Sequence, residues 1–288
     1  MKGRILLLGA GGQLGKEWEL YLKKNGLSYK PCTSNMVDIT DQAALRSVFN
    51  SYHPNIVINC AAYTHVDLAE DEDEEAREVN GEAVGSIAKL CEDAGAKLVH
   101  YSTDYVFKGE QGDQEVFPLG YPETHKPQPI NTYGWSKLMG EQLIQKKCSD
   151  YLIIRVSWLL GAHGNNFVKT MLRLSKEKDK LQVVNDQLGA PTFTDNLVFN
   201  TVALINTGYK GIIHVSSEGL TNWHEIAVKI FQNKGINSKL VPIPTSDYPT
   251  IADRPLYSRL DISRLKDIPG VRIIRWQDGL QELLDQIK

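Results

Sequence analysis

The sequence of 288 residues predicts an α/β protein with a doubly wound parallel sheet and a smaller C-terminal region. Two features predict this class. Short apolar runs recur at wide intervals, and longer stretches with the apolar spacing of helices lie between them. Near-continuous apolar strands that alternate with helices are typical of a parallel sheet covered on both faces. A chain of this length buries a substantial core without disulfides or metals.

The elements follow in regular order as far as about Ser157. The expected strands are residues 4–8, 28–32, 55–62, 97–103, 151–157 and 211–217. The expected helices are residues 16–24, 41–53, 74–95, 134–147, 167–178, 194–206 and 222–233. After Ser157, loops with glycine and proline surround shorter elements, and such loops suit a ligand pocket at the edge of the main sheet.

Two polar stretches predict helix starts. The acidic run 67–75 is typical of a solvent-exposed helix N-terminus, which the helix dipole favours, rather than of a metal site. Asn222 followed by Glu225 fits a helix cap. Neither stretch needs a functional explanation.

Charge and cysteine content exclude several classes of function. The net charge is −3 and the pI is about 6.2, so no global basic field is expected to bind nucleic acid or an anionic membrane surface. No C-x-x-C pair occurs, which argues against zinc or a disulfide framework and favours reduced thiols; the cysteines are Cys32, Cys60, Cys91 and Cys148. The apolar run near the N-terminus is too short for a signal peptide, and no segment approaches a membrane span, so we expect a cytoplasmic protein.

A glycine-rich turn follows the first expected strand. The stretch "GAGGQLG" places Gly9, Gly12 and Gly15 between an apolar strand and a helix. Glycines are needed there because the chain turns tightly, packs helix against strand, and lets a diphosphate reach the backbone amides. The helix N-terminus adds a positive dipole end. This turn predicts a Rossmann-type dinucleotide site.

The end of the second expected strand bears on the choice of dinucleotide. NAD-specific folds carry a carboxylate near this point, whereas here Thr33, Ser34 and Asn35 follow the strand. The 2′-phosphate of NADP therefore meets no repulsion, and we expect NADPH, with NADH as the alternative. Asp38 comes slightly later, and two interpretations remain open: it contacts the adenine, or it caps the next helix through Ala43.

Tyr133 and Lys137 stand four residues apart in an expected helix, so their side chains share one face. This spacing occurs in many helices by chance and becomes informative only with the other motifs. Gly134 is expected to leave room for a flat cofactor, and for Gly140 helix packing is an equally good explanation.

Several motifs together resemble a known family. The glycine turn, "NCAAYTHVD", "HYSTDYVF" and "YGWSK" resemble the extended short-chain dehydrogenase/reductase family. Within it, "RVSWLLGAHGNNFVKTMLRL", "VVNDQLGAPT" and "ADRPLYSRLD" are similar to the dTDP-4-dehydrorhamnose reductases. The resemblance runs from the first strand to the final helix, and the later motifs carry the substrate assignment.

The resemblance implies a set of site residues. The implied catalytic residues are Thr103, Tyr133 and Lys137. The implied cofactor-binding residues are Gly9, Gly12, Gln13, Leu14, Asp38, Ile39, Ala61, Ala62, Tyr63, Thr64, Tyr133 and Lys137. The implied substrate-binding residues are Thr103, Asp104 and Trp158. No metal is assigned to the site. Residues 1–157, joined by later segments, would form the NADP(H)-binding Rossmann domain, and residues 158–288 would mainly bind substrate.

The implied reaction is reduction of the 4-keto group of dTDP-4-dehydro-6-deoxy-L-mannose (dTDP-6-deoxy-L-lyxo-4-hexulose) to dTDP-L-rhamnose, the last step of dTDP-L-rhamnose synthesis. Tyr133 would supply the proton, and Thr103 would orient the ketone. Lys137 would hold the nicotinamide ribose and, with the oxidised nicotinamide, lower the pKa of Tyr133 from about 10 toward neutrality.

Two other functions compete with this reaction. One is a non-catalytic, NADP-binding regulatory subunit like the β subunit of methionine adenosyltransferase, and the other is a sugar-nucleotide epimerase. The expected partner is a dTDP-sugar, and the expected state is a monomer or a homodimer. Some relatives dimerise through magnesium; Glu17 would be one ligand, but Asp195 stands where a glutamate is expected, which argues against that bridge.

Overall fold

A computed structural model describes residues 1–287 of the chain. Within them the main sheet has six strands, all parallel, in the order β10-β5-β4-β3-β1-β2. They are β1 (Ile5–Leu8), β2 (Tyr29–Cys32), β3 (Ile56–Asn59), β4 (Lys97–Thr103), β5 (Tyr151–Val156) and β10 (Gly211–His214). The direction of winding reverses between β1 and β3, and such a reversal opens a ligand-binding crevice at the carboxyl ends of the strands. The predicted doubly wound sheet is confirmed.

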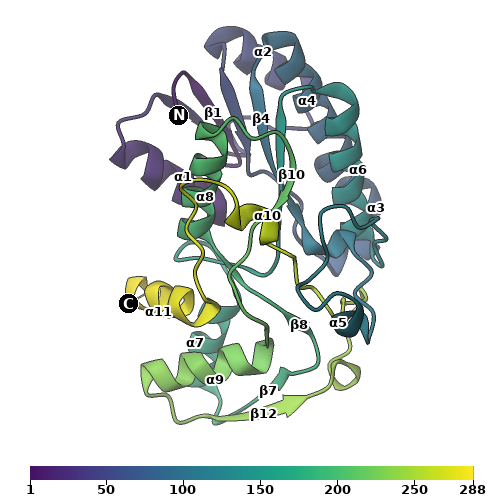
Figure 1. The fold of residues 1–288 in the computed structure, drawn as a ribbon, viewed down its shortest axis with the longest axis vertical. Helices are drawn as coiled ribbons and strands as arrows, with labels where there is room; N and C mark the ends of the chain where they lie inside the picture. Colours follow the sequence, from purple (N-terminus) through teal and green to yellow (C-terminus); the bar gives the residue numbers. More distant parts are fainter. Residues whose placement is uncertain (288) are drawn as a thin grey trace.

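Helices cover both faces of this sheet (Figure 1). One face is covered by α1 (Gln13–Lys24), α8 (Thr194–Asn206) and the short α10 (Ser263–Lys266), and the other by α2 (Gln42–Tyr52), α4 (Ala83–Ala94) and α6 (Thr132–Lys147). Successive residues of β1 point to opposite faces: Ile5 packs in the cluster with Trp18, and Leu6 in the cluster with Ile87. All four residues of β1 are fully buried, so this strand lies at the centre of the core.

Three predicted helices differ from the observed ones by more than one residue at a boundary or by an interruption. Helix α1 begins at Gln13 instead of residue 16, and α6 begins at Thr132 instead of residue 134. The segment predicted as one helix over 74–95 is divided into α3 (Asp73–Arg77), a π-helical turn (Glu78–Glu82) and α4. The π-helical turn carries Asn80, whose fully buried side chain bonds to the loop after β3. Single π-helical turns of this kind are frequent at functional sites.

Two predicted helix starts are confirmed. A short 3₁₀ turn (Leu68–Glu70) leads into α3, whose first turn carries exposed acidic side chains at residues 73–75. In α9 (Trp223–Lys234), the side chain of Asn222 accepts a hydrogen bond of 2.8 Å from the backbone N–H of Glu225. Both follow from the unpaired N–H groups at a helix start.

A second lobe lies beyond the carboxyl ends of the main strands, at the bottom of Figure 1. Strand β7 (Lys180–Val184) pairs in parallel with β12 (Lys239–Ile243), and α7 (Phe167–Glu177), α9 and α11 (Trp276–Gln286) complete a separate apolar cluster. The short strand pairs are β6 (Leu159–Leu160) with β9 (Thr192–Phe193), and β8 (Leu188–Gly189) with β11 (Thr221–Asn222). The remaining short elements are the 3₁₀ turns Asp104–Val106 and Thr245–Asp247, and α5 (Asp113–Val116).

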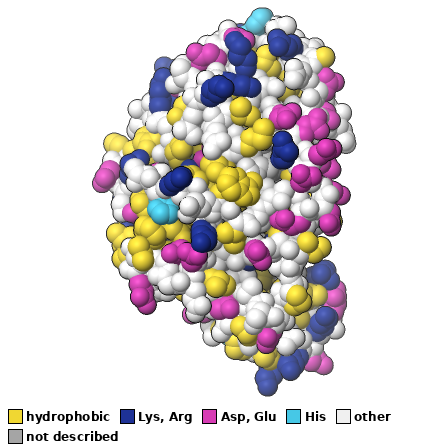
Figure 2. Space-filling view, turned by 90° about the vertical axis from the view of Figure 1, so that its right-hand side faces the viewer, with side chains coloured by type: hydrophobic (Ala, Val, Ile, Leu, Met, Phe, Trp, Pro, Cys, Tyr) yellow, Lys and Arg dark blue, Asp and Glu magenta, His cyan; other side chains and the backbone are white. Residues whose placement is uncertain are grey.

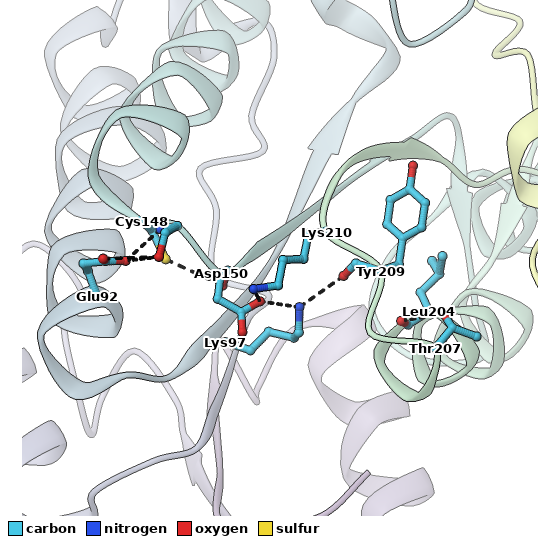
Figure 3. A network of polar contacts seen from close by, with 9 residues as sticks. Glu92, Lys97, Cys148, Asp150, Leu204, Thr207, Tyr209 and Lys210 are labelled. Carbon is cyan, nitrogen blue, oxygen red and sulfur yellow. Dashed lines mark hydrogen bonds and ion pairs between the residues drawn. The ribbon is translucent and has the colours of Figure 1, made fainter.

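The opposite end of the sheet is held by polar contacts (Figure 3). The Lys97 ammonium at the start of β4 donates to Asp150, just before β5, at 2.6 Å and to the carbonyl of Tyr209 at 3.1 Å. Lys210 lies 3.3 Å from the same carboxylate. These contacts hold together the beginnings of β4, β5 and β10, at the end of the sheet opposite the carboxyl ends of the strands.

The surface carries mixed charge. On the face drawn in Figure 2, acidic side chains gather along the right-hand edge, and basic side chains lie mainly elsewhere on that face. None of the helices within residues 1–287 is long and apolar enough to span a bilayer.

Candidate active site

The glycine turn between β1 and α1 has the geometry of a diphosphate cradle. Gly9 has a φ of +73°, and a Cβ there would lie 2.4 Å from the backbone nitrogen of Ala61. A Cβ on Gly15 would lie 2.2 Å from the carbonyl oxygen of Gly9. A Cβ on Gly12 would have only that same oxygen near it, at 3.4 Å. The backbone at Gly12 is therefore open to a ligand. The turn and the N-terminus of α1 therefore fit the diphosphate of a dinucleotide.

The two residues after Gly12 point away from this cradle. The Gln13 amide donates to the carbonyl of Leu159 at 3.1 Å and accepts from Asn166 at 2.8 Å. Leu14 is buried in the core cluster of the sheet. Either residue would therefore reach a dinucleotide through its backbone.

The helix-capping interpretation of Asp38 is wrong. Asp41 caps α2, because its carboxylate accepts from the backbone N–H groups of Ala43 and Ala44 at 2.8 and 3.0 Å. Asp38 instead accepts from the backbone and side chain of Thr40, at 2.9 and 2.8 Å. A turn built on Asp38 thus precedes the helix.

The loop after β3 is fixed by two buried asparagines. Asn59 accepts from the backbone N–H of Ala61 at 3.1 Å. Asn80 accepts from the N–H of Tyr63 and donates to its carbonyl, both at 3.0 Å. The Tyr63 phenol donates to Glu72, and Thr64 is exposed. These bonds fix the backbone of residues 61–63 directly after β3.

A polar cluster stands at the carboxyl end of β4. The Thr103 hydroxyl donates to Asp104 at 3.0 Å and accepts from the backbone N–H of Tyr105 at 3.1 Å. The Tyr133 phenol lies near the Thr103 hydroxyl, and its ring packs edge-on against Tyr105 at 5.6 Å. Ser258, from the "ADRPLYSRLD" stretch, is buried near the Asp104 carboxylate. The fold thus brings Thr103, Asp104 and Tyr133 together, as the motifs predict.

Burial governs the ionisation of this cluster. It raises the pKa of Tyr133 to about 12, with the Asp104 charge adding to the effect and the Thr103 bond opposing it. Burial likewise raises the pKa of Asp104 to about 7, against hydrogen bonds from Thr103 and Ser258. The expected lowering of the Tyr133 pKa involves the Lys137 ammonium and the oxidised nicotinamide together and stays a prediction; the Lys137 ammonium itself is directed to the Tyr101 carbonyl.

Lys137 lies one turn after Tyr133 on α6 and is buried, with 2% exposed. Its ammonium donates to the carbonyl of Tyr101 at 2.7 Å and lies 3.3 Å from the His100 Nε2. Burial lowers the pKa of Lys137 to about 8, and the nearby Glu141 opposes this shift. The Lys137 side chain therefore extends from α6 to residues His100 and Tyr101 of β4.

The two glycines of α6 are explained by backbone contacts. A Cβ on Gly134 would lie 2.4 Å from the carbonyl oxygen of Tyr105, and one on Gly140 would lie 2.3 Å from that of Asn80. The interpretation of Gly134 as room for a flat cofactor is therefore wrong, since protein backbone fills that space. Helix packing accounts for both residues.

Trp158 stands beside a cavity at the junction of the two lobes. Its φ of +45° is unusual for a bulky residue, and its ring stacks on Trp223 at 4.2 Å. Trp223 also lines a cavity of about 910 Å³ whose basic residues are Lys178, Lys180 and Arg254. The cavity is large enough for a drug-sized ligand. It is therefore a candidate site for a bulky anionic substrate.

Within residues 1–287, no group of three His, Cys, Asp or Glu side chains is placed to hold a metal ion. Glu17 accepts from Thr194 at 3.1 Å, and burial, with nearby Asp195, raises its pKa.

Several residues of the site were not predicted from the sequence. They are Asn59, Asn80, His100, Ser258, Trp223 and Arg254. Arg254 forms an ion pair of 2.8 Å with Asp67, which links the loop after β3 to the second lobe. The only sequence signal for Arg254 and Ser258 was their place in a motif used for the family resemblance.

The dinucleotide cradle and the tyrosine and lysine of α6 define a class: an NAD(P)H-dependent oxidoreductase of the short-chain dehydrogenase/reductase type. A family profile described as "RmlD substrate binding domain" matches residues 2–288. The chain therefore belongs to the RmlD family.

Individual relatives agree with this membership. The chain is 38% identical to a dTDP-4-dehydrorhamnose reductase of Escherichia coli K12, over 98% of this chain and 97% of that protein. It is 39% identical to the spore coat polysaccharide biosynthesis protein SpsK of Bacillus subtilis, over the same shares. A crystal structure of dTDP-4-dehydrorhamnose reductase from Bacillus anthracis in complex with NADP superposes with a TM-score of 0.94 at 39% identity, covering 99% of this chain and 100% of that one.

Proposed function

We propose that this protein reduces the 4-keto group of dTDP-4-dehydro-6-deoxy-L-mannose to give dTDP-L-rhamnose, with NADPH as the reductant. The observation that carries the proposal is the presence of the diphosphate cradle and the Thr103–Tyr133 pair at the same edge of the sheet, where β1 and β4 end. Full-length similarity to dTDP-4-dehydrorhamnose reductases supports the choice of substrate.

Tyr133 is the proton donor. Because its pKa is about 12, the phenol carries its proton throughout the neutral range. Thr103 holds the phenol and orients the ketone oxygen toward it, and Asp104 accepts a hydroxyl of the sugar through its second oxygen, which is buried and has no partner among the described residues. When bound, the reduced nicotinamide supplies the hydride. The phenol proton then goes to the developing alkoxide.

Lys137 and the loop after β3 bind the cofactor in this proposal. The Lys137 ammonium holds the nicotinamide ribose, with the segment Ala61 to Thr64 beneath it. Gly9, Gly12, Gln13 and Leu14 bind the diphosphate through backbone groups, and Asp38 and Ile39 border the adenine. Because Thr33, Ser34 and Asn35 carry no charge at the end of β2, a 2′-phosphate is accepted there.

The second lobe binds the nucleotide part of the substrate. Trp158 offers a flat apolar wall and stacks on Trp223, which lines the large cavity. Lys178, Lys180 and Arg254 supply positive charge for the diphosphate of the substrate. Residues 1–157 together with β10 thus form the cofactor-binding part, and most of 158–288 forms the substrate-binding part.

The test is consumption of NADPH, followed by its absorbance, when the purified protein receives dTDP-4-dehydro-6-deoxy-L-mannose. We expect steady turnover with NADPH and slower turnover with NADH. A parallel sample with the Tyr133→Phe variant controls for contaminating reductases. Tight NADPH binding without turnover would favour the non-catalytic regulatory subunit, and interconversion of sugar epimers without net consumption would favour an epimerase.

A further inference from the structure

Two members of the acidic run 67–75 differ from the rest in what they contact. Asp67 directly precedes the 3₁₀ turn Leu68–Glu70, and Glu70 ends it. Both residues are partly buried, whereas residues 71–75 are exposed. The carboxylates of Asp67 and Glu70 bind distant parts of the chain, so a helix start in solvent does not account for them.

Glu70 holds the first residue of α6, which directly precedes Tyr133. One of its carboxylate oxygens accepts from the backbone N–H of Thr132 and the other from the Thr132 hydroxyl, both at 2.9 Å. The first N–H groups of a helix have no partner within the helix, and a negative charge there suits the helix dipole. Two bonds to one residue restrict both the position and the rotation of the first turn. Glu70 therefore limits where the Tyr133 phenol can lie.

The turn that carries Glu70 is itself anchored. Asp67 accepts from the backbone N–H of Ala252 at 3.1 Å and forms its ion pair with Arg254 at 2.8 Å. The carbonyl of Asp253, between these two residues, accepts from the side-chain NH₂ group of Asn131, the N-cap of α6, at 2.8 Å. The turn and the start of α6 thus share a third support, the stretch 252–254.

The same turn supports the tyrosine ring. Ala69, between the two carboxylates, is fully buried in a small cluster with Tyr63 and Ala76, and Tyr133 packs against this cluster. Tyr105 meets the Tyr133 ring edge-on at 5.6 Å. The backbone before the phenol and the ring itself are therefore held from the segment after β3.

We propose that Glu70 is a positioning residue for proton transfer: through Thr132 it fixes the start of α6, so that the Tyr133 phenol meets the ketone oxygen of the bound substrate. The role in catalysis rests on the proposed function, in which Tyr133 is the proton donor. Glu70 acts through its partner and does not touch the reacting atoms. A misplacement of about 1 Å in a reacting group can lower a rate by about 10²-fold.

The first test needs neither substrate nor activity. In Glu70→Ala without ligands, exchange of the Thr132 backbone amide hydrogen, followed by NMR, should become about 10- to 100-fold faster, because the amide loses a charged acceptor. Glu74→Ala is the matched control: Glu74 is exposed on the same acidic run and forms no side-chain hydrogen bond within residues 1–287, so exchange at Thr132 should not change. Unchanged exchange in Glu70→Ala would overturn the proposal.

The second test separates positioning from binding. In Glu70→Ala, kcat should fall about 10- to 100-fold, while KM for NADPH and for the keto-sugar stays within about threefold, because the proposed binding residues are unchanged. Glu70→Gln should restore kcat to within about fivefold of wild type. Its amide oxygen can accept from the Thr132 N–H, and its NH₂ group can donate to the Thr132 hydroxyl. A wild-type kcat in Glu70→Ala, or equal losses in kcat and in both KM values, would overturn the positioning role.

Thr132→Val gives the same comparison if Glu70→Ala does not fold. It removes the hydroxyl bond to Glu70 and keeps the backbone bond and the side-chain shape, so kcat should fall about three- to tenfold at unchanged KM. An unchanged kcat in this variant would count against the proposal. A wild-type protein that consumes no NADPH would refute the proposed function, while amide exchange at Thr132 would still decide whether Glu70 fixes α6.

Discussion

Replacement of Tyr133 by phenylalanine removes one oxygen atom and little else from the structure. The ring is half-buried and keeps its edge-on contact with Tyr105, and the Thr103 hydroxyl retains its bonds to Asp104 and Tyr105. Stability should therefore change by less than about 1 kcal/mol. Because the pKa of Tyr133 is about 12, nearly every wild-type molecule carries the phenol proton near neutral pH. The loss in the variant is then the full contribution of general acid catalysis.

That contribution is typically about 10²–10⁴ in rate, or about 3–5 kcal/mol of transition-state stabilisation. Turnover of Tyr133→Phe should fall by this factor in the NADPH consumption assay. The affinity for NADPH, titrated separately by fluorescence, should stay within about threefold, because the cradle residues are unchanged. Turnover near the wild-type rate would refute the assignment of the proton donor. Equal losses in turnover and cofactor affinity would instead indicate a binding role for the phenol.

Four further outcomes are expected. In Lys137→Ala, turnover and NADPH affinity should each fall about 10- to 100-fold, and an unchanged NADPH titration would contradict a ribose contact. Asp104→Asn should be more stable than wild type at high pH. The pKa of Asp104 is about 7 in the folded protein and has the ordinary value of 3.8 in the unfolded chain. Wild type therefore has the stability due to its protonated carboxyl fully below pH 3.8 and loses it as the pH rises through 7. The difference should reach a few kcal/mol in urea unfolding at pH above 7 and vanish in acid. Arg155→Met should lower the free energy of unfolding by about 3–5 kcal/mol, because Glu141 would remain buried and unpaired. A decrease below about 1 kcal/mol would show that the Glu141 carboxylate takes up a proton instead. Gly15→Ala should lower both stability and NADPH affinity, since its Cβ would lie 2.2 Å from the Gly9 carbonyl, and a variant with wild-type NADPH binding would exclude that close approach.

The strand and helix pattern was predictable because it depends on local periodicity. Each strand of the main sheet falls within a segment expected from its apolar run, and α7 and α8 end within one residue of expectation. The division of residues 73–94 was not predictable, because the π-helical turn depends on a contact between Asn80 and Tyr63 that is distant in sequence. Hydrophobic periodicity in the sequence does not predict helix boundaries that tertiary contacts determine.

The same distinction applies to the site. The glycine turn and the Tyr133–Lys137 spacing are local patterns, and the structure places both at the carboxyl ends of the strands. The pKa of Tyr133 could not be read from that spacing, because it depends on burial and on where the Lys137 ammonium points. Asn59 and His100 carry no motif of their own, since their importance arises from the register that aligns β3 with β4.

Gln13 lies in the first turn of the protein, yet its side chain is bound to Leu159 and Asn166, which follow β5 by chain order. Leu159 and Asn166 belong to the segment that leads from the main sheet into the second lobe. The residue that begins α1, directly after the glycine turn, therefore also anchors that segment, so one side chain ties the dinucleotide cradle to the second lobe.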